Sequence, residues 1–128
     1  MNSLLMYRRA LLTTGLLAVA AATAAQPTTP EDPAWPVAGR QGVIQVVIVP
    51  EKAARDREAY TRQIERLCPP QSTCFLNFHT NSSGAPLAVP LPDAIAQEST
   101  AVFRRSVKQG GEYFRWSCRM GMDAANCF

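Results

Sequence analysis

The chain has 128 residues, with 13 lysines and arginines, 10 aspartates and glutamates, four cysteines and one histidine. This length supports one domain, and a hydrophobic fraction of 47% is typical of a globular protein rather than a disordered one. A net charge of +3 is too small to indicate a nucleic-acid-binding protein. One histidine and no dense acidic cluster leave few ways to build a metal or acid–base site, so we expect no metal and no cofactor.

Residues 1–25 have the pattern of an export signal that is cleaved from the mature protein. An arginine pair at 8–9 precedes an apolar run over 10–22, and the triplet Ala-Thr-Ala at 22–24 matches a signal-peptidase site. The apolar run is shorter than the roughly 20 residues that span a bilayer. No cysteine lies near the cleavage site, so we expect no stable membrane anchor after cleavage.

The arginine pair also partly matches a twin-arginine signal, although Tyr7 stands where Ser or Thr is usual. We favour a Sec signal, because disulfide-bearing cargo gains nothing from folding in a reducing cytosol. Either route predicts a periplasmic or secreted protein. The mature chain would have 103 residues with a net charge of +1, so we expect no nucleic-acid partner.

The first mature segment, 26–42, is expected to be an extended, irregular tether. Its four prolines lie at positions 27, 30, 33 and 36. Proline has no amide donor and a fixed φ, which disfavours regular hydrogen-bonded structure. Trp35 is the exception, because so large an apolar side chain is expected to dock on the domain.

The next three segments, within a single domain over 43–128, predict a β-α-β unit. Continuous apolarity over 43–49 is typical of a central strand that is covered on both faces. Over 51–68 the period becomes helical, and the apolar face carries Ala53, Tyr60, Ile64 and Leu67. A second strand over 74–79 should lie parallel to the first, with a right-handed crossover.

The remainder of the domain begins with a loop over 80–93, which is rich in proline and glycine. One interpretation of the next segment is a helix over 93–108. We favour a short helical turn at 93–98 and then two strands, 99–108 and 112–118, because Gly110-Gly111 suits a tight hairpin turn. The sequence therefore predicts a small two-layer α+β domain in which the β-α-β unit is succeeded by a β-hairpin. One main helix would pack on a mixed sheet.

All four cysteines fall in the mature part, and an even number in an exported protein predicts disulfides. Among three pairings we favour Cys68–Cys74 and Cys118–Cys127, which close short loops. Zinc sites use closer spacings than these. A thiol nucleophile would need His79, which lies on the opposite face of the strand from Cys74.

Alternation along the predicted strands assigns side chains to a core face and an opposite face. The core face carries Cys74, Leu76, Phe78, Phe114, Trp116 and Cys118. The opposite face carries Phe75, Asn77, His79, Tyr113, Arg115 and Ser117, joined by Arg104 or Arg105 depending on the register. The candidate binding residues are Asn77, His79, Tyr113 and Arg115, a set that suits an anionic or peptide partner. The alternative is a solvated sheet face of mixed polar residues.

These patterns support three functional hypotheses. The first is a non-enzymatic protein-binding or inhibitory module of the immunity type that meets its partner in the cell envelope. The second is an accessory subunit of an envelope complex, contacted through the tether and Trp35. The third is a small hydrolase that uses Ser82 or Ser83 with His79 and Asp93, but no nucleophile-elbow motif surrounds these serines. We therefore expect no enzyme.

Overall fold

The computed structural model describes Gly15, residues 19–25 and residues 32–128. The chain divides into two units, 1–31 and 32–128. Most of the predicted export signal and the start of the tether lie outside the described residues. Gly15 and residues 19–25 are exposed and belong to no helix or strand. In the described part of the chain, no helix has the length and hydropathy needed to cross a bilayer.

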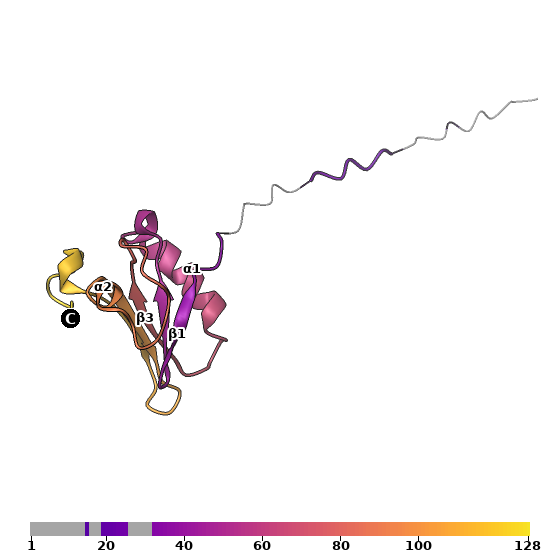
Figure 1. Ribbon diagram of the computed structural model, residues 1–128. Helices are drawn as coiled ribbons and strands as arrows, with labels where there is room; N and C mark the ends of the chain where they lie inside the picture. The colour runs from indigo at the N-terminus through magenta and orange to yellow at the C-terminus, as the bar shows by residue number, and fades with distance from the viewer. Residues whose placement is uncertain (1–14, 16–18, 26–31) are drawn as a thin grey trace, which may run out of the picture. The chain divides into compact units, whose positions relative to one another are not determined.

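The second unit is built on a five-stranded mixed sheet with strand order β1-β2-β3-β4-β5 (Figure 1). The strands are β1 (Val37–Gln41), β2 (Ile44–Ile48), β3 (Cys74–His79), β4 (Ser99–Arg105) and β5 (Glu112–Trp116). The helices are α1 (Arg57–Leu67) and α2 (Asp93–Ala96), with 3-10 turns η1 (Glu51–Ala53) and η2 (Cys118–Met120). Strands β2 and β3 are parallel, and the other neighbours are antiparallel. This arrangement confirms the predicted α+β fold, including the helical turn and hairpin over 93–116.

Strand β1 lies in the segment that was expected to be an irregular tether. It pairs antiparallel with β2, and the pairing continues upstream because the Ile48 amide donates to the Pro36 carbonyl at 2.8 Å. Pro36 is the last proline of the segment, so every residue of Val37–Gln41 keeps its amide donor. The last part of the predicted tether is therefore one of the two edge strands of the sheet.

Helix α1 begins at Arg57, later than the predicted start at residue 51. Pro50 is followed by the 3-10 turn η1, and Asp56 then caps α1 by accepting hydrogen bonds from the amides of Glu58 and Ala59 at 3.1 and 3.2 Å. This N-cap satisfies amides that have no partner within the helix, so it fixes the start of α1. The helix ends at Leu67, just before the two prolines at 69–70.

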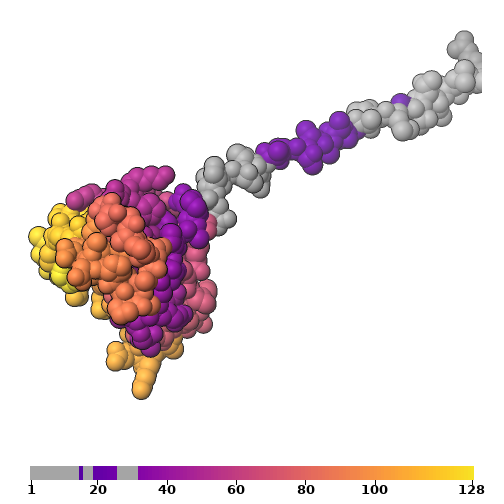
Figure 2. Space-filling model, viewed as in Figure 1, coloured from indigo at the N-terminus to yellow at the C-terminus, as the bar shows by residue number. Residues whose placement is uncertain are grey.

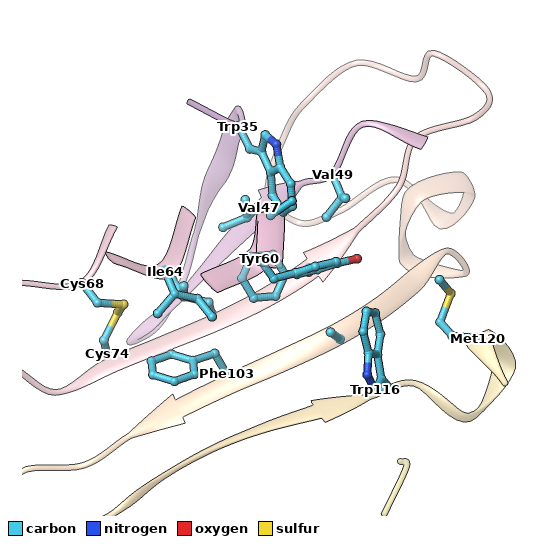
Figure 3. Packing of buried hydrophobic residues seen from close by; sticks show 14 residues of the cluster. Trp35, Val47, Val49, Tyr60, Ile64, Cys68, Cys74, Phe103, Trp116 and Met120 are labelled. Atoms are coloured by element: carbon cyan, nitrogen blue, oxygen red, sulfur yellow. A yellow bond between two sulfur atoms is a disulfide. The ribbon is translucent and has the colours of Figure 1, made fainter. Parts of the chain in front are cut away.

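The main core lies between α1 and the sheet, and Tyr60 is at its centre (Figure 3). Its ring lies 5.0 Å from that of Trp35, 5.0 Å from Phe78 and 5.2 Å from Trp116 between centroids, each pair edge to face. Trp35 is only 6% exposed, which confirms that it docks on the domain. Burial raises the pKa of the Tyr60 hydroxyl to about 12. This aromatic cluster joins the N-terminal segment, α1, β3 and β5.

Two disulfides, Cys68–Cys74 and Cys118–Cys127, confirm the predicted pairing. The first joins the end of α1 to the start of β3 and is buried in the core. The second ties the last residues to η2, where the Cys118 amide also donates to the carbonyl of Phe128 at 2.9 Å. Structural disulfides form and persist in oxidising compartments, which indicates an extracytoplasmic protein.

Candidate functional site

The sheet has α1 on one side, and the segment 80–98 with α2 on the other (Figure 1). Figure 2 shows this segment, in salmon and orange, packed beside the purple residues of β1. A Cβ added to Gly39 would lie 2.7 Å from the Val89 Cγ2 atom, so the segment and β1 are in close contact. Ile95 of α2 is fully buried. Part of the sheet face opposite α1 is therefore covered.

His79 lies under this covering segment, and only 7% of the residue is exposed. Its Nδ1 atom is 3.0 Å from the carbonyl oxygen of Ile95, and a carbonyl can only accept, so Nδ1 carries a proton. Burial lowers the pKa of the imidazole, although this hydrogen bond and the charge of Glu98 oppose the shift. His79 was predicted to share an accessible sheet face with Asn77, Tyr113 and Arg115, but the structure buries it, because 80–98 folds back over the end of β3.

Beyond the covered part, this sheet face carries half-buried and exposed side chains, and we call it the open face. Its residues are Phe75, Asn77, Val102, Arg104, Tyr113 and Arg115. The register places Arg104 between Phe75 of β3 and Tyr113 of β5, in one row across three strands. The structure thus assigns Arg104, not Arg105, to this face. It brings together three of the four predicted binding residues and leaves His79 apart.

Arg105 lies on the other side of the sheet, where the register pairs it with Cys74 and Glu112. Its Nε atom forms an ion pair with the Glu112 carboxylate at 2.7 Å. The neighbouring cation, Arg104, therefore does not share that carboxylate.

Backbone and amide oxygens hold the Arg104 guanidinium in place. Its Nη1 atom donates to the carbonyls of Leu76 at 2.8 Å and Phe103 at 2.9 Å. Its Nη2 atom donates to the Oδ1 atom of Asn77 at 2.7 Å. Burial lowers the pKa of Arg104. Asn77 is thus a residue that orients Arg104, a role that its sequence position alone does not indicate.

A cavity of about 390 Å³ lies over this row, at the turn between β4 and β5. It is lined by Phe75, Arg104, Ser106, Gln109, Gly110, Gly111, Glu112 and Tyr113. Tyr113 is 48% exposed, and the Arg115 guanidinium lies 4.9 Å from the centroid of its ring. An exposed tyrosine stacked with an arginine suits recognition of another molecule.

A second cavity of about 230 Å³ lies near the ends of β3 and η2. Its charged side chains are Glu51, Arg55, Glu98 and Arg119. Both arginines bind the backbone: Arg55 donates to the Met120 carbonyl, and Arg119 donates to the Ser99 carbonyl at 2.6 Å. No sequence pattern indicated this cavity, because η2 was not predicted. The contacts hold the C-terminal segment on the domain.

The residues of the hydrolase hypothesis have other hydrogen-bond partners. The Ser82 hydroxyl donates to the Glu98 carboxylate, and the Ser83 hydroxyl donates to the Asn81 side chain at 3.2 Å. His79 binds the Ile95 carbonyl instead of either serine. Among the residues that the structure describes, no three His, Cys, Asp or Glu side chains are grouped to hold a metal ion.

Comparisons with models of protein families, with curated proteins and with solved structures each gave no match to this chain. The open face and its cavity are therefore the features from which we infer a function.

Proposed function

We propose that the protein is exported to the periplasm by the Sec route and acts there as a non-enzymatic binding module of the inhibitory or immunity type. Its open face binds a protein partner. The observation that carries this proposal is the exposed Tyr113–Arg115 pair beside the cavity of about 390 Å³. Tyrosine and arginine are enriched among the residues that supply most of the binding energy at protein interfaces.

The position of these residues supports the same function. Tyr113 and Arg115 belong to β5, which is paired to β4 along its whole length. Strand β4 is in turn paired to β3, which packs on the core. Side chains on a paired strand are better preorganised than side chains on a loop, so less conformational entropy is lost on binding.

The accessory-subunit alternative has weaker support. It uses the tether and Trp35 as the contact with the complex, but Trp35 is only 6% exposed and packs against Tyr60 in the core. Deleting 26–42 would also remove the edge strand β1, so such a deletion would disrupt the domain as well as the tether.

The proposal is tested by capture of envelope proteins on the immobilised mature protein. We expect the double variant Tyr113→Ala/Arg115→Ala to retain at most about one tenth of the captured partner, as is usual when two anchor residues are truncated. Val37→Ala/Arg40→Ala on β1 is the matched control, because both residues are exposed and lie away from the open face. Equal capture by the wild type and the Tyr113/Arg115 variant would reject the open face as the binding surface.

A further inference from the structure

Arg104 is a half-buried cation that has only neutral hydrogen-bond acceptors. Its bonds go to two backbone carbonyls and to the Asn77 amide oxygen. Within the described part of the chain, no carboxylate forms an ion pair with Arg104. The acid that lines the cavity, Glu112, is bonded to Arg105. A partly buried charge is stabilised by an opposite charge, and this domain supplies none to Arg104.

The guanidinium of Arg104 also has N–H donors that make no hydrogen bond within the domain. Its three hydrogen bonds use both N–H groups of Nη1 and one of Nη2. A guanidinium has five N–H donors, so the N–H of Nε and one N–H of Nη2 are left. Two nitrogens on one guanidinium match the two oxygens of a carboxylate. The bonds to Leu76, Phe103 and Asn77 fix the group and leave one N–H on each of these two nitrogens.

The cavity beside Arg104 can admit a side chain from another molecule. Phe75 and Tyr113, the register neighbours of Arg104, contribute aromatic walls. Gly110 and Gly111 form part of the lining at φ values of 72° and 83°, where glycine is favoured. The entering group would therefore meet aromatic surface, glycine backbone, the Arg104 cation and the Glu112 carboxylate, which is already paired with Arg105.

We propose that this cavity binds an aspartate or glutamate side chain of the partner protein, with Arg104 as the group that pairs with the carboxylate. This inference rests on the proposed function and names the chemistry of the partner. Charge complementarity supports an acidic partner segment. Arg115 adds a second cation to the open face, and Lys108 lies in the adjacent β4–β5 turn.

The test is an NMR titration of the mature protein with the peptide acetyl-Gly-Glu-Gly-amide and with its glutamine analogue. We expect the glutamate peptide to shift the Arg104 Nε–H resonance saturably, and to bind at least about tenfold more tightly than the glutamine peptide. Equal binding of the two peptides would overturn the proposal.

Two variants and one control locate the binding site. Arg104→Gln should lower the affinity for the glutamate peptide at least about tenfold, whereas Arg40→Gln, the same charge change on β1, should lower it less than about twofold. Gln109→Glu adds an acid at the exposed rim of the cavity and should weaken binding of the glutamate peptide severalfold. Because residue 109 is exposed, this variant leaves the core unchanged. Unchanged affinity in Arg104→Gln or Gln109→Glu would contradict the proposal.

This titration needs no partner protein, so it separates the two proposals. Peptide binding at the cavity together with unchanged capture by Tyr113→Ala/Arg115→Ala would reject only the proposed function. Loss of capture in that variant without specific binding of the glutamate peptide would reject only the carboxylate site.

Discussion

The two faces of the sheet differ in how their aromatic and charged residues are used. On the α1 side, aromatic rings pack edge to face around Tyr60. The Arg57 guanidinium lies over the Phe114 ring, 3.8 Å from its centroid. On the other side, 80–98 covers part of the sheet and leaves Arg104, Tyr113 and Arg115 uncovered. The difference shows that the main aromatic core lies on the α1 side, whereas part of the other side carries half-buried and exposed polar and aromatic side chains.

The sharpest comparison is between two phenylalanines of β3. Phe78 is fully buried on the α1 side, whereas Phe75 is half-buried on the open face. We expect Phe78→Ala to lower the free energy of unfolding by about 3–5 kcal/mol, because it leaves a cavity in the core. Phe75→Ala should cost about 1 kcal/mol, for the loss of partly buried apolar area. Urea denaturation of the two variants measures both values, and equal losses would contradict the division between the faces.

The next largest effect on stability is expected from the Cys68–Cys74 disulfide at the end of α1. Replacing Cys68 and Cys74 by alanine should lower the free energy of unfolding by about 2–3 kcal/mol, because the unfolded chain regains the freedom of a closed loop. Tyr113→Ala/Arg115→Ala on the open face should change it by less than about 0.5 kcal/mol. Denaturant midpoints under identical buffers compare the two variants. A large loss in the Tyr113/Arg115 variant would show that the open face is part of the folding core.

A smaller effect, on the pH dependence of stability, is expected from His79, which lies beneath 80–98. The pKa of His79 is lower in the folded protein than its ordinary value of about 6.5. As the pH falls below about 6.5, the unfolded state therefore binds a proton at His79 before the folded state does. The free energy of unfolding falls over this range, until the pH reaches the lower pKa of the folded state. His79→Asn keeps a donor for the Ile95 carbonyl but does not titrate, so it should flatten the stability profile in this window. Thermal unfolding between about pH 5 and 7.5, set around that ordinary pKa, measures the difference. Identical slopes for the wild type and the variant would exclude His79 as the cause.

The sequence predicted those parts of the fold that depend on local pattern. Alternation located β5, helical spacing located the buried face of α1 at Tyr60 and Ile64, and short loops between cysteines identified both disulfides. Parity also placed Asn77, Tyr113 and Arg115 on one face. Each of these features is determined by neighbours within a few residues along the chain.

The features that sequence reasoning missed depend on contacts between distant segments. Proline and glycine content identified 80–93 as a loop, but not that this loop and the helical turn after it fold back over His79. The choice between Arg104 and Arg105 required the register of β4, because the two residues point to opposite faces. The hydrogen bond from Arg104 to Leu76 joins residues that are 28 positions apart. No local pattern in the sequence encodes that contact.

The open face, rather than the α1 side, is the surface that we propose to bind the partner. Amide hydrogen exchange of the mature protein, free and with the captured partner, tests this assignment most directly. We expect slower exchange over Glu112–Trp116 and the adjoining turn at 106–111 on binding, with no change in α1. Protection confined to α1, with unchanged exchange in β5 and the turn, would contradict it.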